Sequence, residues 1–312
     1  MGKYFAGPQG RAARRRLRKN LQLMDLGVTK QTQSRYYDAV RRLFPVVSRV
    51  STFEEMDEQI SLWIQRRFSQ GEPLNNVADA LSGMHYFVPA SKKQLPQSWR
   101  LFGVWRKYEV PSRAPPLTAD LVLSFAGKCL EELNFSLATL LLLGFHCCLR
   151  TGEILNIAAD DLLVNSETGI LHLKKTKGGI RHNTKESVTI ECPIVREVVL
   201  QTISIQKQRR LMNAPLWTAS GQAFRSAFHR LCKQFDVLRL NFRGYSLRRG
   251  GATAYFQACG SMERTLLRGR WASSAVARIY LCDALSQLPK LKGTSKTRSM
   301  MKQFLPILQP GR

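Results

Sequence analysis

A tyrosine and a tryptophan stand among arginines in the stretch LRGRWASSAVARIYLCDAL, residues 267–285. The phenol of Tyr280 is either a packed aromatic group or a nucleophile, and residue type alone favours packing. Two earlier segments place arginines where they could hold an anion. Arg150 follows an apolar run in CLRTGEILNI, and Arg248 precedes two glycines in RGYSLRRGGATAYF. A guanidinium offers a fixed fork of donors to phosphate or carboxylate oxygens, so these residue types predict an oxyanion site.

Each motif also has a simpler structural explanation. Arg150 and Glu153 have the spacing of an i,i+3 pair on a helix, and the two adjacent arginines before the glycines could be ordinary surface charge. Lys175 and Lys177, in LHLKKTKGGIRHN, stand where a strand runs into a loop, where basic side chains are commonly solvated. The glycines would allow another backbone to approach closely, and a helix N-terminus there would favour an anion.

The charge balance predicts a polyanionic partner. Forty-eight Lys and Arg against twenty-two Asp and Glu give a formal net charge of +26. Such an excess opposes compact folding by self-repulsion, and it is typical of proteins that bind nucleic acid. An anionic membrane is the weaker alternative, because the most apolar run, residues 137–149, is too short to cross ~30 Å of hydrocarbon.

The same reading predicts a non-secreted protein of the nucleus or cytoplasm. No apolar signal core follows the first charges, and GRAARRRLRK is either a nuclear address or a phosphate-binding arm. The seven cysteines form no CxxC pair and have no histidine at zinc spacing. We therefore expect reduced, mostly buried thiols and no metal site.

Hydrophobic periodicity predicts the fold class: mainly α with a small antiparallel β-sheet. Before residue 110 the pattern is helical, as in STFEEMDEQISLWIQRRFSQG, for which Ser51 is the expected N-cap. Thr118 is the expected cap of a later helix. After residue 160 the period changes to two, so residues 169–175 and 186–194 should form a hairpin or the core of a small sheet.

These patterns divide the chain into five parts. We expect a disordered basic arm, a helical domain, a Pro-rich linker, a catalytic domain and a basic tail, at residues 1–27, 28–110, 111–118, 119–288 and 289–312.

The order of the motifs resembles that of tyrosine recombinases of the phage-integrase type. That family orders its residues Arg, Lys, His-x-x-Arg, His or Trp, and Tyr. The matching residues here are Arg150 in RxxE, Lys177 in TKGG, Arg248 in YSLRRGGAT, Trp271 in GRW and Tyr280 in RIYL. The nine-residue step from Trp271 to Tyr280 agrees with the family's spacing, and the resemblance covers about residues 28–285. The sequence around SLRRGGAT and GRW resembles recombinases of eukaryotic mobile elements more than the bacterial chromosome-dimer resolvases.

The resemblance implies an all-α core-binding domain, a mixed α+β catalytic domain, and a DNA strand-transfer enzyme. Tyr280 would attack a DNA phosphodiester and leave a covalent 3′-phosphotyrosine with a free 5′-hydroxyl. Arg150 and Arg248 would clamp the non-bridging oxygens, and the indole N–H of Trp271 would bind the same phosphate. The phosphotyrosine conserves bond energy, so no cofactor is expected.

The remaining site residues follow from the same resemblance. Lys177 would protonate the leaving 5′-oxygen, with Lys175 as the alternative, and Glu153 would orient the arginines. Tyr245 stands where the family has the His of His-x-x-Arg; a phenol can donate a hydrogen bond but is a poor base at pH 7.

We expect double-stranded DNA as the partner and a homotetramer on two DNA sites, with the apolar QFLPIL segment of the tail docking on a neighbour. Predicted DNA-binding residues are Lys175, Arg249, Arg270, Arg14, Arg15 and Arg16. The alternatives are a catalytically degenerate DNA-binding protein of the same fold, favoured by Tyr245, and a type IB topoisomerase.

Overall fold

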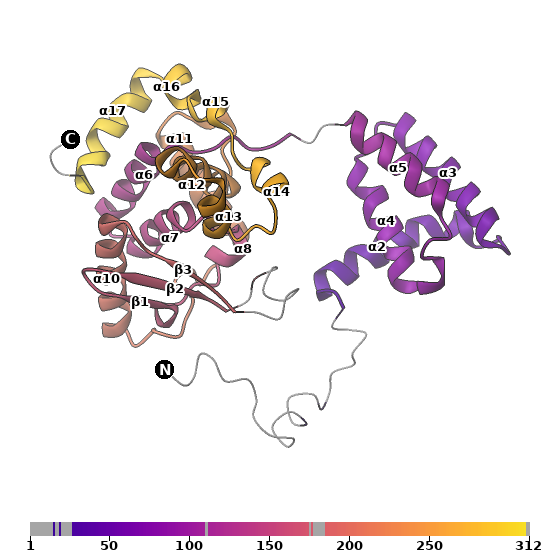
Figure 1. The fold of residues 1–312 in the computed structure, drawn as a ribbon, viewed down its shortest axis with the longest axis horizontal. Helices are drawn as coiled ribbons and strands as arrows, with labels where there is room; N and C mark the ends of the chain where they lie inside the picture. Colours follow the sequence, from indigo (N-terminus) through magenta and orange to yellow (C-terminus); the bar gives the residue numbers. More distant parts are fainter. Residues whose placement is uncertain are drawn as a thin grey trace. The chain divides into compact units, whose positions relative to one another are not determined.

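The computed structural model describes residues 27–109, 112–174 and 185–309, with Arg15, Lys19 and Thr176. The chain divides into two compact units, Met1–Ser112 and Arg113–Arg312. As predicted, the fold is mainly helical with one small antiparallel sheet (Figure 1).

The first unit is all-α in its described residues. Its elements are α2 (Lys30–Val47), α3 (Phe53–Ser69), α4 (Leu74–Phe87), the 3-10 turn η2 (Pro89–Ser91) and α5 (Pro96–Tyr108). Apolar side chains at helical spacing, among them Ile60, Leu81 and Trp105, form its core. The expected cap of α3 is wrong by one residue, because Thr52 rather than Ser51 accepts from a first-turn amide.

A buried carboxylate joins α3 to α5. Asp57 accepts hydrogen bonds from the backbone amides of Gln97 and Ser98, both at 2.8 Å, and from the Ser98 hydroxyl at 2.6 Å. These amides belong to the first turn of α5, which has no capping side chain of its own. Asp57 therefore caps α5 from a neighbouring helix and fixes how the two helices pack.

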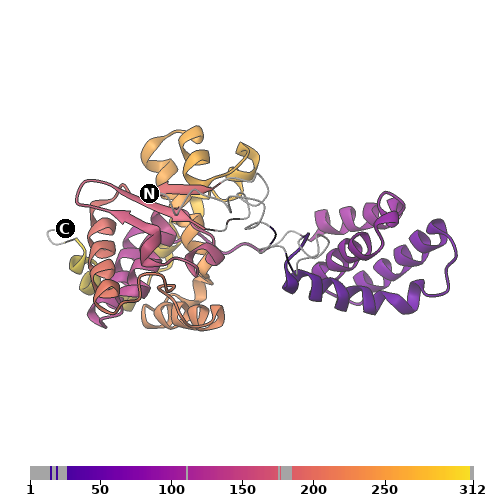
Figure 2. The same ribbon diagram turned by 90° about the horizontal axis from the view of Figure 1, so that it is seen from below.

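In the second unit a three-stranded sheet lies at one side of the helices, as the two views show (Figures 1 and 2). Its helices are α6 (Ala119–Glu131), α7 (Phe135–His146), α8 (Thr151–Ile154), α10 (Pro193–Gln208), α11 (Gly221–Gln234), α12 (Gly244–Cys259), α13 (Met262–Gly269), α14 (Ser274–Arg278), α15 (Asp283–Ser286), α16 (Leu288–Lys292) and α17 (Ser295–Phe304), with 3-10 turns η3 (Ala159–Asp161), η4 (Leu238–Leu240) and η5 (Leu305–Ile307). Thr118 caps α6 as predicted.

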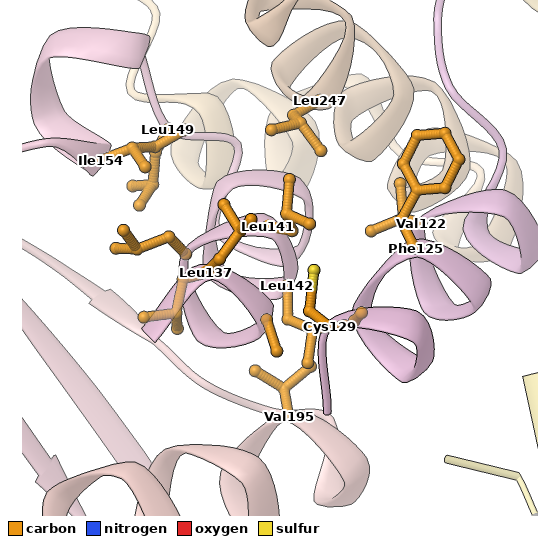
Figure 3. Close-up of a cluster of buried hydrophobic side chains, with 14 of the residues drawn as sticks. Val122, Phe125, Cys129, Leu137, Leu141, Leu142, Leu149, Ile154, Val195 and Leu247 are labelled. Atoms are coloured by element: carbon orange, nitrogen blue, oxygen red, sulfur yellow. The ribbon is translucent and has the colours of Figure 1, made fainter. Parts of the chain in front are cut away.

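Helix α7 runs through the core of this unit. Eight consecutive residues, from Leu137 to Gly144, are buried, and the close-up shows α7 side chains meeting those of α6, α8, α10 and α12 (Figure 3). An apolar helix of this length with neighbours on all sides belongs inside a protein core. The end of α7 is therefore a rigid base for the residues that follow it.

The predicted hairpin is confirmed. Strands β2 (Gly169–Leu173) and β3 (Glu186–Thr189) pair antiparallel, with Leu171 opposite Val188 and both buried. A third strand, β1 (Leu162–Val164), pairs with β2 and was not predicted. Its three residues are too few for a visible alternation in sequence.

Most of the segment expected to be a linker lies in the second unit. Pro115, Pro116 and Leu117 are buried, and the Leu117 amide donates to the Ser246 carbonyl of α12 at 3.2 Å. The prolines give this segment an extended backbone, but its apolar side chains pack on α12.

The last helix packs on its own chain. Phe304, from the QFLPIL segment expected to dock on a neighbour, is buried in the core of the second unit. Its ring centroid lies 5.9 Å from that of Phe235. Gly127 of α6 makes room for it, since a Cβ there would overlap the Phe304 carbonyl. In this structure α17 therefore completes its own unit.

All seven cysteines are free, and four of them are buried: Cys129, Cys147, Cys148 and Cys232. Burial raises the pKa of Cys129, Cys147 and Cys232 to about 12, which keeps these thiols protonated. They are packing residues, as the sequence predicted.

Candidate active site

Arg150 is held in place by the turn between α7 and α8. Cys148 adopts a left-handed backbone (φ 49°), which reverses the chain so that Arg150 becomes the N-cap of α8. Glu153 accepts from the Arg150 amide at 2.8 Å and from its guanidinium at 2.6 Å. The i,i+3 pair considered from sequence thus exists, and it leaves the Arg150 side chain 30% exposed.

Arg248 is fully buried and joins three segments. Its guanidinium donates to the Cys148 carbonyl in the α7–α8 turn and, at 2.7 Å, to the Gly269 carbonyl at the end of α13. Its Nε has no partner in the described part of the chain. Burial and the cations Arg150 and Arg270 lower the pKa of Arg248.

The two glycines after the arginine pair explain how α12 comes so close. A Cβ on Gly251 would overlap the carbonyl of Phe145 in α7, and one on Gly250 would overlap the carbonyl of Leu117. The backbones of α12, α7 and the segment before α6 are therefore in direct contact. This contact seats Arg248 against the α7–α8 turn, as the motif suggested.

Trp271 and Tyr280 pack on Arg248. The Arg248 guanidinium carbon lies 4.8 Å from the Trp271 ring centroid and 5.1 Å from that of Tyr280. The two rings are 4.7 Å apart. Trp271 is 8% exposed, whereas Tyr280 is only partly buried. A cation over two aromatic faces is a favourable arrangement, and it brings the predicted nucleophile to the predicted phosphate ligand.

Tyr245 lies beside Tyr280, with ring centroids 5.5 Å apart. Burial opposes ionisation of Tyr280, but Tyr245, Arg248, the indole of Trp271 and Arg150 together outweigh it, so the pKa of Tyr280 is lowered. Burial and the interaction with Tyr280 raise the pKa of Tyr245. The site thus favours ionisation of one phenol and opposes ionisation of the other.

Glu153 is the carboxylate shared by these arginines. Besides Arg150, it pairs with Arg270 at 2.6 Å and lies 4.0 Å from Arg248, with a side chain only 3% exposed. Three guanidiniums face this carboxylate and that of Glu186, which pairs with Arg270, so the group keeps a positive charge. The role of Glu153 in orienting the arginines, proposed from sequence, matches these contacts.

Two arginines expected to contact DNA have other partners. The side chain of Arg270 is 8% exposed and is bound by Glu153 and, at 3.0 Å, by Glu186 of β3. Arg249 is buried and donates to the Ala114 carbonyl at 2.5 Å. Neighbouring residues on a helix point about 100° apart, so Arg248 enters the site while Arg249 holds the segment before α6. We now interpret both as supports of the site.

The other predicted residues fall outside this arrangement. Both candidate catalytic lysines, Lys175 and Lys177, and the arm residues Arg14 and Arg16 lie outside the described residues, and Arg15 is exposed.

Sequence reasoning missed Arg268, which joins α13 to β3. Its side chain is 3% exposed and donates to the carbonyls of His146 and Thr189, at 3.0 and 2.8 Å. Arg268 is the last residue but one of α13, and these hydrogen bonds anchor the end of that helix to α7 and β3. One arginine among several in LLRGRW gives no sequence signal of burial.

His146, next to Arg268, makes the stability of this unit sensitive to acid. Its Nε2 accepts from the amides of Glu191 and Cys192, which requires the neutral ring. Burial, then Arg268 and Arg196, lower its pKa from 6.5 to about 3. The native state therefore binds fewer protons than the unfolded state between these pH values, and stability falls as pH drops below 6.5.

We expect the variant His146→Gln, which keeps an acceptor but cannot titrate, to lose this acid sensitivity. Between pH 7 and 5 the wild type should lose about 2 kcal/mol more unfolding free energy than the variant. Urea unfolding at each pH measures the difference. An equal loss in the two proteins would contradict the assignment.

The described residues contain no group of three or more His, Cys, Asp or Glu side chains placed to hold a metal ion. No helix among the residues with assigned structure has the length and apolarity needed to cross a bilayer.

No protein-family model matches the sequence, and no curated protein matches it. Several solved structures have a similar fold. The Tn1549 transposon integrase in complex with transposon right end DNA has 14% identity and a TM-score of 0.59, covering 94% of this chain and 97% of that one. A lambda integrase tetramer bound to a Holliday junction has 15% identity and a TM-score of 0.54, covering 82% and 73%. The XerH site-specific recombinase in its post-cleavage complex has 12% identity and a TM-score of 0.53, covering 84% and 78%. The chain therefore has the tyrosine recombinase fold.

Proposed function

We propose that this chain is a site-specific DNA recombinase or integrase that breaks and rejoins double-stranded DNA through a covalent 3′-phosphotyrosine on Tyr280. The observation that carries the proposal is the packing of Tyr280 on Trp271 and Arg248, with Arg150 in the same positive site. The net charge of +26 supports a DNA partner, as do the DNA-bound proteins that share the fold.

Charge stabilisation is the main requirement of the reaction. The Tyr280 oxygen attacks phosphorus, and negative charge builds on the non-bridging oxygens. Arg150 is partly exposed and fixed by Glu153, so it meets the phosphate first. The rings of Tyr280 and Trp271 cover Arg248, so the phosphate reaches this guanidinium once the Tyr280 ring turns toward the DNA. Arg150 is therefore preorganised for the phosphate, whereas Arg248 becomes a phosphate ligand only after the Tyr280 ring has moved.

The leaving 5′-oxygen needs a proton. We assign it to Lys177, in the loop between β2 and β3, with Lys175 as the alternative. The strands that carry this loop are next to the site, because Arg270 pairs with both Glu186 of β3 and Glu153. The chain's own residues thus provide nucleophile, phosphate ligands and acid.

Recombination exchanges strands between two duplexes, so we further propose a homotetramer on two DNA sites. The lambda integrase with this fold was captured as a tetramer on a Holliday junction. A mobile element is the proposed genetic setting, because the transposon integrase shares the fold over 97% of its solved chain.

Tyr245 favours a second candidate, a degenerate DNA-binding protein of the same fold. It occupies the place of the histidine that the family uses in its active site. Such a protein would bind DNA in a salt-sensitive way and never cleave it.

A nicked suicide substrate separates the two candidates. Cleavage close to the nick releases a short fragment, so the covalent complex cannot reverse and survives SDS. We expect a protein–DNA adduct with wild type and with Tyr255→Phe, and none with Tyr280→Phe. Tyr255 is a matched control because it lies on α12 but contacts Arg268 rather than the site.

The recombinase proposal would be overturned if the protein binds DNA carrying the ends of the mobile element in a salt-sensitive way but forms no adduct with it. Relaxation of supercoiled plasmid without strand exchange would instead indicate a topoisomerase.

A further inference from the structure

The two tyrosines of the site form a pair with unequal surroundings. Tyr245 lies in the first turn of α12, one turn before Arg248, and its ring is tilted by 43° to that of Tyr280 at 5.5 Å. The two phenols are therefore direct neighbours, and each affects the ionisation of the other. Tyr245 is 38% exposed, so the pair is open to solvent.

Cations face Tyr280 from several elements. Arg248 of α12 lies against its ring, and Arg150 at the start of α8 is the next cation. Arg113 donates to the backbone carbonyl of Ile279 at 3.5 Å. Among the described residues, the acidic side chain beside these arginines is Glu153, and it already forms ion pairs with Arg150 and Arg270. A negative charge on the Tyr280 oxygen is therefore favoured.

The pair can hold one negative charge far more easily than two. The cations that favour ionisation act most strongly on Tyr280, and its pKa is lowered while that of Tyr245 is raised. Tyr245 therefore keeps its proton and donates to the ionised oxygen of Tyr280. A residue that keeps its own proton cannot accept one, so Tyr245 does not replace a histidine base.

We propose, resting on the recombinase function above, that Tyr245 is a positioning residue that donates a hydrogen bond to the nucleophilic oxygen of Tyr280 and favours its deprotonated form. Cleavage then proceeds through the ionised fraction of Tyr280. The Tyr280 proton goes to water before the attack, the Tyr280–phosphorus bond forms, and the bond from phosphorus to the 5′-oxygen breaks. The leaving oxygen takes its proton from Lys177 or water. Tyr245 keeps its proton throughout.

The first test needs no DNA. Ultraviolet absorbance of tyrosinate is followed against pH in the full chain, and subtraction of the Tyr280→Phe curve isolates the Tyr280 step. Tyr245→Phe keeps the ring and its packing and removes only the hydroxyl. We expect this change to raise the pH at which Tyr280 ionises by about one unit. Tyr255→Phe, on the same helix, should leave it in place.

The second test measures adduct formation on the nicked substrate. Below the pKa of Tyr280 the ionised fraction falls tenfold per pH unit, so Tyr245→Phe should react about tenfold more slowly near pH 7.5 and approach wild type in alkali. A purely structural role for Tyr245 predicts no change in either test.

If Tyr280 ionises at the same pH in Tyr245→Phe as in wild type, the inference is overturned, whether or not the protein cleaves DNA. If the ionisation pH rises as expected but the wild-type protein forms no adduct, the recombinase function is overturned and the inference about the tyrosine pair stands.

Discussion

Replacement of Arg248 by lysine is expected to slow adduct formation roughly a hundredfold to a thousandfold while DNA binding stays close to wild type. The guanidinium uses two of its nitrogens on the carbonyls of Cys148 and Gly269 and presents its face to Trp271 and Tyr280. An ammonium is a single point charge on a flexible stem and cannot satisfy both carbonyls and both rings together. The charge that remains sustains binding, but the fixed geometry at the phosphate is lost.

Single-turnover reaction with the nicked substrate measures the rate, and a salt titration of DNA binding measures affinity. Arg264→Lys is the matched control, because Arg264 is an exposed arginine of α13 away from the site. A rate within tenfold of wild type would contradict the assignment of Arg248. A proportional loss of binding would show a general electrostatic role instead.

Local patterns predicted the elements that carry the site. The apolar run that became α7, the Thr118 cap of α6 and the β2–β3 hairpin are visible in sequence because each depends on neighbours a few residues apart. The three-residue strand β1 is not visible, because it exists only by pairing with β2.

The arginines show where sequence reasoning stops. The sequence is similarly basic around Arg248, Arg249 and Arg270, and we expected the last two to contact DNA. Their burial depends on partners far away in the chain: the carbonyls of Cys148 and Ala114, and the Glu153 carboxylate. Only the order of the motifs, compared with a known family, separated Arg248 from the others. No single motif could do so, because charge alone does not say which side chain is buried.

The pairing of Tyr245 with Tyr280 was beyond prediction for the same reason. The sequence showed a phenol in the place of a histidine and hence a missing base. The structure puts that phenol against the nucleophile, where a raised pKa is useful because Tyr245 acts as a donor.

Glu153 is the residue whose loss should most affect stability. Glu153→Ala leaves Arg270 with Glu186 as its remaining carboxylate and removes the cap that holds Arg150. Removing one partner of a buried ion pair leaves an uncompensated charge and costs about 3–5 kcal/mol. Urea unfolding of the full chain measures this, with Glu167→Ala, an exposed glutamate in the β1–β2 turn, as the control. A loss no larger than that of the control would contradict the role of Glu153.

Glu153→Gln separates its charge from its shape. The amide keeps the size of the side chain and one acceptor oxygen, so the Arg150 amide can stay capped and most of the packing survives. The negative charge among three guanidiniums is gone, and mutual repulsion should loosen Arg150, the partly exposed member of the set. We therefore expect adduct formation to fall by a larger factor than the modest loss of stability explains. If the rate and the stability of Glu153→Gln both match wild type, the carboxylate serves only as a cap, and backbone carbonyls suffice to position Arg248 and Arg270.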